Sequence, residues 1–120
     1  MKKIIVVDDH DAIRKGVKLL LDTSGKYKAF EAANGNLALQ VIDKENPDLA
    51  IVDLMMPEMD GFTLCDEIKK KYPNLPVVIL TAKADPETEE KVVHQFKPDK
   101  YLVKPIDNQV LLDTVEQILK

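Results

Sequence analysis

Five polar or charged side chains that could take part in catalysis or bind a metal each stand at or next to the end of a short apolar run. These are, in chain order, Asp8, Asp9, Asp53, Thr81 and Lys104. Short, continuous runs rich in Val, Ile and Leu are typical of strands that are buried on both faces of a parallel sheet. The carboxyl ends of such strands lie along one edge of the sheet, where ligands bind in open α/β folds. The pattern therefore predicts a single site that holds three carboxylates, a hydroxyl and an ammonium group.

Three carboxylates at close range repel one another unless a positive charge joins them. Ligation by oxygen alone suits a hard cation, and Mg2+ is typically held by one or two carboxylates with water and phosphate oxygens. Mg2+ and Lys104 together would balance the carboxylates, so an incoming phosphoryl group would meet a roughly neutral, preorganised site. A carboxylate can also act as a nucleophile. Asp53 stands alone after its run and is the predicted acceptor, whereas Asp8 and Asp9 form a pair better suited to holding metal.

The elements that must position these residues alternate regularly along the chain. The apolar runs predict strands near residues 4–7, 49–52, 77–80 and 101–103, with a weaker strand at 27–32. The amphipathic patterns between and after them predict five helices. Strict alternation of strand and helix argues for an α/β fold with a parallel sheet and right-handed crossovers. Because 120 residues suit one domain, we expect a single domain over the whole chain, residues 1–120.

Aspartate and proline residues mark several of the expected helix ends. Asp60, Asp85 and Asp107 each stand directly before a helical pattern, at the N-cap position that Asp favours. Pro86 then takes the first helical position, where the missing N–H of proline removes no hydrogen bond. Pro73 lies just past the expected end of the third helix.

Four segments of the chain contain the candidate site residues: IIVVDDH at residues 4–10, DLMMPEMDG at 53–61, LTA at 80–82 and YLVKP at 101–105. Together they resemble the receiver domain of bacterial response regulators, which act in two-component phosphorelay signalling. Each segment is modest alone, but four in the right order and spacing form a specific signal. The resemblance covers essentially the whole chain. It implies a flavodoxin-like, doubly wound sheet of five parallel strands in the order 2-1-3-4-5, flanked by five helices.

The resemblance also implies a role for each site residue. Asp53 would accept a phosphoryl group from the phosphohistidine of a partner kinase. Asp9, Asp53 and the backbone carbonyl of Met55 would bind Mg2+ directly, and Asp8 would act largely through a metal-bound water. Lys104 would pair with a phosphoryl oxygen. The protein would then be a signalling switch that catalyses only its own phosphorylation and dephosphorylation.

Residues further from the metal would transmit the signal. The resemblance implies that Thr81 donates its hydroxyl to the phosphoryl group and that Tyr101 swings inward when Thr81 moves. It also implies a cis Lys104–Pro105 bond that aims the lysine. These movements would shift an equilibrium between two packings of the face built by the fourth helix, fifth strand and fifth helix. The implied partners are a sensor histidine kinase or histidine phosphotransfer protein and a downstream output, with a possible homodimer on phosphorylation.

Two further expectations concern less regular parts of the sequence. Met55 and Lys83 lie two positions beyond Asp53 and Thr81, so we predict that they flank the path of the hydrolytic water and tune the lifetime of the phosphoryl group. The segment 92–100 lacks the Gly-Ala that many receivers carry before the last strand, and it has Lys-Pro in its place. The sequence therefore leaves open where the fourth helix ends.

Two other functions compete with this interpretation. Asp9-His10-Asp11 after an apolar run resembles the start of a haloacid-dehalogenase-type phosphatase, but that family needs a further acidic motif after the lysine. Only Asp107, Asp113 and Glu116 follow Lys104, in what looks like a plain amphipathic helix. An unphosphorylated interaction module usually lacks a site residue, whereas the complete set is present here. A flavin or nucleotide binder would want a Gly-rich phosphate loop after the first strand, and this loop is acidic.

The amino-acid composition argues against several classes of function. The formal net charge is −4, and no basic stripe with interleaved aromatic residues is present, so direct nucleic-acid binding by this chain is not expected. No apolar run approaches the length of a membrane span. The single cysteine, Cys65, excludes an internal disulfide and is interpreted as a small buried hydrophobe. A reducing, cytoplasmic setting is the default expectation.

Overall fold

A five-stranded parallel sheet forms the centre of the computed structural model, which describes residues 1–56, 59–82 and 85–120. The strands are β1 (Lys2–Val7), β2 (Tyr27–Ala32), β3 (Leu49–Val52), β4 (Val77–Thr81) and β5 (Lys100–Val103). The helices are α1 (Asp11–Thr23), α2 (Gly35–Glu45), α3 (Gly61–Lys71), α4 (Pro86–Gln95) and α5 (Asn108–Ile118). The strand order is β2-β1-β3-β4-β5, which confirms the predicted doubly wound, flavodoxin-like fold.

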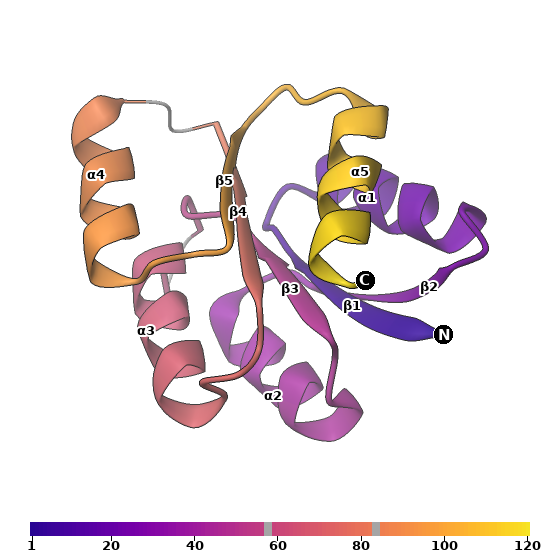
Figure 1. The fold of residues 1–120 in the computed structure, drawn as a ribbon. Coiled ribbons are helices and arrows are strands. Elements are labelled where there is room, and N and C mark those ends of the chain that lie inside the picture. Colours follow the sequence, from indigo (N-terminus) through magenta and orange to yellow (C-terminus); the bar gives the residue numbers. More distant parts are fainter. Residues whose placement is uncertain (57–58, 83–84) are drawn as a thin grey trace.

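Helices cover both faces of the sheet (Figure 1). Alternate side chains of a strand point to opposite faces, so Ile4 and Val6 of β1 pack with buried residues of α1 and α5. Ile5 and Val7 pack instead with buried residues of α2, α3 and α4. Because each central strand is covered on both sides, its sequence is apolar throughout rather than alternating, which is why the runs were readable as buried parallel strands.

The helix starts follow the predicted capping pattern. The side chains of Asp60, Asp85 and Asp107 accept hydrogen bonds from backbone N–H groups in the first turns of α3, α4 and α5. Two caps were not predicted: Asn34 caps α2, and the imidazole Nδ1 of His10 accepts from the N–H of Ile13 at 3.5 Å at the start of α1. These interactions satisfy backbone donors that have no partner within a helix.

The end of α4, which the sequence left open, lies at Gln95. Phe96 caps the helix, and Lys97 has the left-handed backbone conformation with a φ of 56°. The N–H of Lys97 donates to the carbonyl oxygen of Val92 at 3.2 Å, which closes the last turn. Glycine is the usual residue in this conformation because it lacks a Cβ. A lysine here therefore terminates the helix at some energetic cost.

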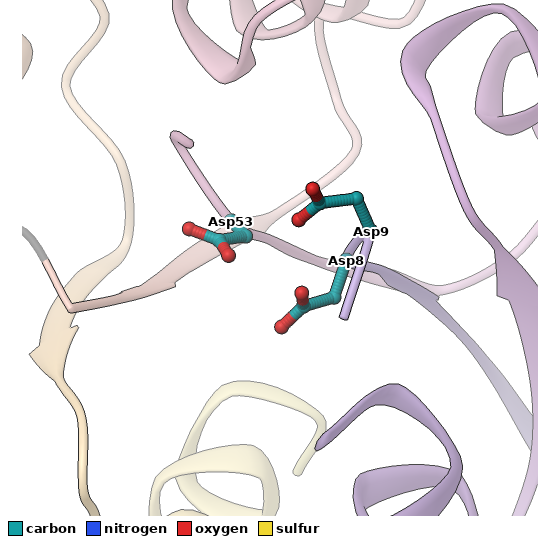
Figure 2. A group of neighbouring side chains, drawn as sticks. All are labelled: Asp8, Asp9 and Asp53. Carbon is teal, nitrogen blue, oxygen red and sulfur yellow. The ribbon is translucent and has the colours of Figure 1, made fainter. Parts of the chain in front are cut away.

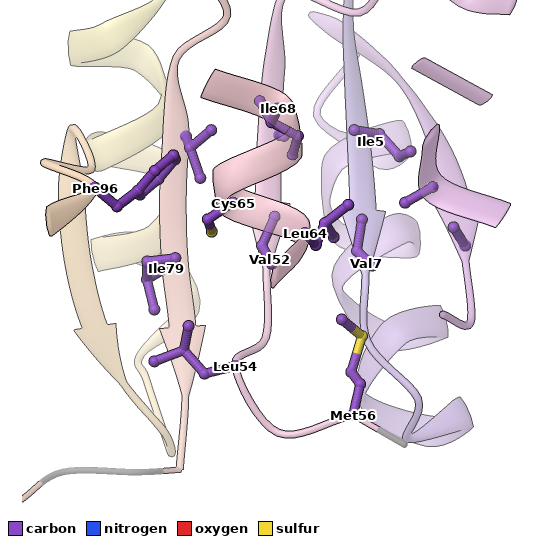
Figure 3. Packing of buried hydrophobic residues seen from close by; sticks show 14 of the residues in the cluster. Ile5, Val7, Val52, Leu54, Met56, Leu64, Cys65, Ile68, Ile79 and Phe96 are labelled. Carbon is purple, nitrogen blue, oxygen red and sulfur yellow. The ribbon is translucent and has the colours of Figure 1, made fainter. Parts of the chain in front are cut away.

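The core on the α2–α4 side of the sheet contains the single cysteine (Figure 3). Cys65 is buried on α3 beside Leu64 and Ile68, and burial raises the pKa of its thiol to about 12. A thiol with this pKa remains protonated at neutral pH and is a poor nucleophile. The interpretation of Cys65 as a buried hydrophobe is confirmed.

Candidate functional site

Three carboxylates meet at the carboxyl edge of the sheet (Figure 2). Asp8 and Asp9 follow β1 and Asp53 follows β3, and these strands are neighbours with Val7 paired to Val52. The N–H of Asp53 donates to the carbonyl oxygen of Val7 at 2.9 Å, so the strand pairing continues into the site. Each carboxylate offers an oxygen that lies within 4.8 Å of the others. The parallel register therefore brings together residues that are far apart in sequence, as predicted.

Lys104 bridges two of these carboxylates. Its Nζ donates to Asp8 Oδ2 at 2.7 Å and to Asp53 Oδ2 at 3.0 Å. The lysine follows β5, and its N–H donates to the carbonyl oxygen of Thr81 at 2.8 Å, which ties it to the end of β4. The Lys104–Pro105 peptide is cis, as the resemblance implied. The ammonium group thus lies inside the acidic cluster, where its charge acts on both buried carboxylates.

The electrostatics of the cluster follow from burial and mutual contact. Burial raises the pKa of Asp8 and the nearby Asp53 charge raises it further, although the Lys104 ammonium opposes both. Burial alone would lower the pKa of Lys104, but its hydrogen bonds to Asp8 and Asp53 outweigh that effect and raise it. One ammonium cannot balance three carboxylates. The surplus negative charge makes the site complementary to a divalent cation.

The donor set fits Mg2+. All three candidate ligands are carboxylates, which are the donors that this hard cation prefers, and Asp9 is exposed and accessible from solvent. Both oxygens of Asp8 already accept hydrogen bonds, Oδ1 from the N–H of His10 at 2.9 Å and Oδ2 from Lys104. Both oxygens of Asp53 are held in the same way, by the Met55 N–H and by Lys104, so the exposed Asp9 is the carboxylate most open to a cation.

Backbone groups orient the Asp53 carboxylate, and the sequence did not reveal them. The N–H of Met55 donates to Asp53 Oδ1 at 3.1 Å, so the two oxygens of Asp53 are held by different donors. The two predicted roles of Met55, a metal-binding carbonyl group and a flank to the path of the hydrolytic water, remain predictions. Its side chain is 55% exposed at the edge of the site. Every residue type except proline can donate a backbone N–H, so no sequence signal could have identified this contact.

Gly61 lets the start of α3 approach the acceptor closely. A Cβ at this position would lie 2.4 Å from the Cα of Leu54 and 2.5 Å from the carbonyl oxygen of Asp53. Both neighbours are backbone atoms, which can move aside only if the chain itself shifts. The N–H of Gly61 also donates to the carbonyl oxygen of Leu54 at 3.0 Å. A side chain here would therefore push the loop that carries Asp53 away from the helix.

The two predicted switch residues lie on the neighbouring strands. Thr81 is fully buried at the end of β4, and its carbonyl oxygen is the acceptor of the Lys104 N–H described above. Tyr101 on β5 is partly buried and packs against the core on the α2–α4 side. Burial raises the pKa of its hydroxyl, and the carboxylates of Glu89 and Asp85 add to the effect. The predicted partner of Met55 in lifetime control, Lys83, lies outside the described residues.

A further polar residue, Arg14, lies buried beside the site. Its Nη1 donates to the carbonyl oxygen of Asp8 at 2.9 Å, and its Nε donates to Glu31 Oε1 at 2.9 Å. Its Nη2 donates to Asp11 Oδ1 at 2.7 Å. A periodic helical pattern cannot distinguish a buried arginine from a solvated one, so sequence reasoning assigned Arg14 no role at the site.

The acidic residues after Lys104 do not form a second metal-binding motif. Asp107 caps α5, Asp113 accepts a hydrogen bond from Gln109 at 2.8 Å, and Glu116 lies 3.6 Å from the ammonium of Lys26. Each of these carboxylates thus has a local partner on or near α5. The arrangement gives no support to the phosphatase alternative.

Comparison with known protein families shows to which family this chain belongs. The family model for the response regulator receiver domain matches residues 4–116. This chain belongs to that family. Receiver domains are signalling switches of two-component systems, and the triad of Asp8, Asp9 and Asp53 is consistent with their metal site.

Individual relatives of this receiver agree in sequence and fold. The transcriptional regulatory protein YdfI of Bacillus subtilis is 33% identical over 100% of this chain and 56% of its own length. The chemotaxis protein CheY4 of Vibrio cholerae has a structure that superposes with a TM-score of 0.91 at 31% identity, covering 98% of each chain. The BeF3-activated DrrB receiver domain superposes with a TM-score of 0.89 at 31% identity, covering 99% of this chain and 97% of its own.

The receiver spans about half the length of the curated relatives it matches. Among the helices in the described part of the chain, none is long and apolar enough to cross a bilayer.

Proposed function

We propose that this receiver is a Mg2+-dependent phosphoacceptor in which Asp53 takes a phosphoryl group from the phosphohistidine of a sensor histidine kinase or histidine phosphotransfer protein. The observation that carries the proposal is the Lys104 ammonium, which contacts Asp8 and Asp53 within a cluster of three carboxylates. This arrangement offers a nucleophile, a metal site and a fixed cation at one point. The domain would comprise residues 1–120.

The transfer exchanges one bond to phosphorus for another. A carboxylate oxygen of Asp53 attacks the phosphorus atom, the new P–O bond forms, and the P–N bond of the donor breaks with its electron pair leaving on the imidazole nitrogen. The Met55 N–H holds Asp53 Oδ1, which fixes the rotation of the carboxylate. The Lys104 ammonium, now shared by Asp8 and Asp53, would also contact a phosphoryl oxygen and stabilise its charge.

Mg2+ would be held by Asp9, Asp53 and the carbonyl group of Met55, with Asp8 acting through water. When bound it neutralises charge on the transferring phosphoryl oxygens. The site residues fit this role because they are carboxylates that gather within 4.8 Å and carry surplus negative charge. The similarity to a receiver described as BeF3-activated supports the same chemistry in this chain.

Phosphorylation would switch the face formed by α4, β5 and α5. Thr81 would donate its hydroxyl to the phosphoryl group, and Tyr101 would move inward with it. This face exposes the apolar side chains of Val93, Val103 and Val110, which supports a docking or dimerisation role. The output would be a downstream protein or a further domain, since one relative is named as a transcriptional regulator. The family and the unpaired Cys65 support a cytoplasmic setting.

Intact-mass spectrometry after incubation with acetyl phosphate tests the proposal. Wild type and Asp53→Asn would be compared with and without Mg2+, with circular dichroism showing that both are folded. We expect one added phosphoryl group on the wild type only when Mg2+ is present, and none on the variant. A folded wild-type protein that gains no mass with Mg2+ would contradict the proposal and favour an unphosphorylated interaction module.

A further inference from the structure

Arg14 is a buried cation that the proposed chemistry does not use. Only 7% of the residue is exposed, although it lies in the first turns of α1. Its guanidinium group donates to three separate acceptors: the carbonyl oxygen of Asp8, Glu31 Oε1 and Asp11 Oδ1. Burying a guanidinium group is expensive unless each part is paired. Each of the three guanidinium nitrogens donates one hydrogen bond, so the charge is held in a single orientation.

We propose that Arg14 is a positioning residue for the metal site: it holds the peptide between Asp8 and Asp9 so that the Asp9 carboxylate is presented to Mg2+. The inference rests on the proposed function. The Asp8 carbonyl group and the Asp9 nitrogen belong to one planar unit. Fixing the carbonyl oxygen at 2.9 Å from Arg14 Nη1 therefore fixes the direction in which the chain enters Asp9.

The surrounding contacts show why Asp9 depends on this arginine. Asp8 is anchored directly, because its N–H donates to the carbonyl oxygen of Ala32 at 3.2 Å and its carboxylate accepts from His10 and Lys104. Asp9, by contrast, is exposed after the end of β1. The hydrogen bond from Arg14 to the Asp8 carbonyl group constrains the peptide between the two residues, and the His10 N–H, which bonds back to Asp8 Oδ1, closes the turn on the other side of Asp9.

Glu31 keeps the guanidinium group in this orientation. It lies on β2, where the parallel register pairs it with Val6, just before the acidic residues of the neighbouring strand. Its carboxylate accepts from Arg14 Nε, so the arginine connects α1 and β2 to the β1–α1 turn. A planar guanidinium group presents donors on three separate nitrogens in fixed directions, whereas lysine offers all its donors from one rotating nitrogen. Charge alone would therefore not replace the arginine.

The positioning role and a simple charge effect predict opposite results. Removing a cation close to a cation-binding site should strengthen Mg2+ binding if electrostatic repulsion is what matters. Loss of positioning should weaken Mg2+ binding even though a positive charge has been removed. The sign of the change in Mg2+ affinity therefore separates the two explanations.

The test is a Mg2+ titration of the full chain without any phosphodonor, followed by 15N NMR shifts of the backbone amides near the site. The variants are Arg14→Met, Arg14→Lys and Glu31→Gln. The controls are Lys18→Met, which removes a partly exposed ion pair from the same helix, and Ile42→Val, which weakens the core away from the turn. Removing a group that orients a metal ligand typically lowers metal affinity by about tenfold or more.

We expect a dissociation constant raised about tenfold in Arg14→Met and raised in Arg14→Lys as well, with a smaller rise in Glu31→Gln. Both controls should match the wild type. The rate of phosphorylation by acetyl phosphate should fall at low Mg2+ in the three variants and recover at saturating Mg2+, because positioning acts through metal affinity. A defect that persisted equally at all Mg2+ concentrations would overturn the proposal.

Unchanged or tighter Mg2+ binding in Arg14→Met would also overturn it while leaving the proposed function intact. If Arg14→Met does not fold, Arg14→Lys carries the test, because it keeps the positive charge but not the guanidinium geometry, and wild-type affinity in that variant would count against the proposal. A wild-type protein that binds no Mg2+ would overturn the proposed function itself, and with it this inference.

Discussion

Lys104 is the residue on which the electrostatic balance of the site depends. Its ammonium group contacts two carboxylates whose side chains are only 5% and 7% exposed, those of Asp8 and Asp53. A buried carboxylate without a cationic partner is strongly unfavourable. The lysine therefore stabilises the fold before any phosphoryl group arrives, and the same contacts hold it ready to receive one.

Replacing Lys104 by Met should lower the free energy of unfolding by about 3 kcal/mol in the absence of Mg2+, because two buried carboxylates lose their cation. Added Mg2+ should recover part of the loss, since it binds the folded state. Urea unfolding with and without Mg2+ measures both effects. Lys100→Met is the matched control, because Lys100 is exposed on β5. Equal stability of Lys104→Met and wild type would show that the ion pairs contribute nothing.

At the scale of single elements, the end of α4 is held in a conformation that its sequence does not favour. Lys97 has a φ of 56°, and L-amino acids with a Cβ pay roughly 1–2 kcal/mol in this region. The turn persists because the N–H of Lys97 bonds to Val92 and because Phe96 is buried in the core. This strain lies beside the face that the proposed switch would use.

Lys97→Gly should therefore raise the free energy of unfolding, by about 0.5 kcal/mol once the greater freedom of glycine in the unfolded chain is subtracted. The matched control is Lys69→Gly, an exposed position on α3, where glycine should cost about 1 kcal/mol. Chemical denaturation gives both values. Destabilisation of the same size at the two positions would contradict the account of the helix end.

Asp22 links α1 to β2 and makes this connection sensitive to pH. Its Oδ1 accepts from the N–H of Ala29 at 2.9 Å, and its Oδ2 pairs with Lys18. The hydrogen bond from Lys18 lowers the pKa of Asp22, and the Ala29 N–H adds to the effect despite partial burial. A carboxyl group with a lowered pKa stabilises the fold above its unfolded pKa, and this contribution is lost as pH falls through the folded pKa.

Asp22→Asn should be less stable than wild type at neutral pH by about 0.5 kcal/mol, a small value because the Lys18 pair is about one-third exposed. The difference should shrink as pH falls below about 5 and vanish once wild-type Asp22 is protonated. Unfolding midpoints measured across that range check the sign. In a Lys18→Met background the difference at neutral pH should be smaller, and a gap that grew at low pH would contradict the assignment.

At the scale of the whole molecule, the parallel sheet is what turns scattered residues into a site. Residues from position 8 to position 104 meet because β1, β3, β4 and β5 all end at one edge. The sequence was sufficient to predict this meeting, since continuous apolar runs and Asp caps identify the strands and helix starts. Residue type predicts a structural feature wherever that feature requires a particular side chain, such as an Asp at a helix N-cap.

Other features depend on geometry that residue type does not encode. The hydrogen bonds from the backbone N–H groups of His10 and Met55 to the acidic side chains could come from any residue except proline. The buried pairing of Arg14 with Glu31 joins residues 17 positions apart, in different elements. The end of α4 falls at a lysine where the conformation favours glycine. These details become predictable only when the three-dimensional packing is known.

The identity of the acceptor residue is the central claim, and locating the acyl phosphate tests it most directly. The chain would be phosphorylated with acetyl phosphate and Mg2+ and then reduced with borohydride, which converts an aspartyl phosphate to homoserine. Peptide mapping by mass spectrometry should find homoserine at position 53 and unmodified aspartate at positions 8 and 9. Homoserine at Asp8 or Asp9, or its absence from a chain that has gained a phosphoryl group, would contradict the account.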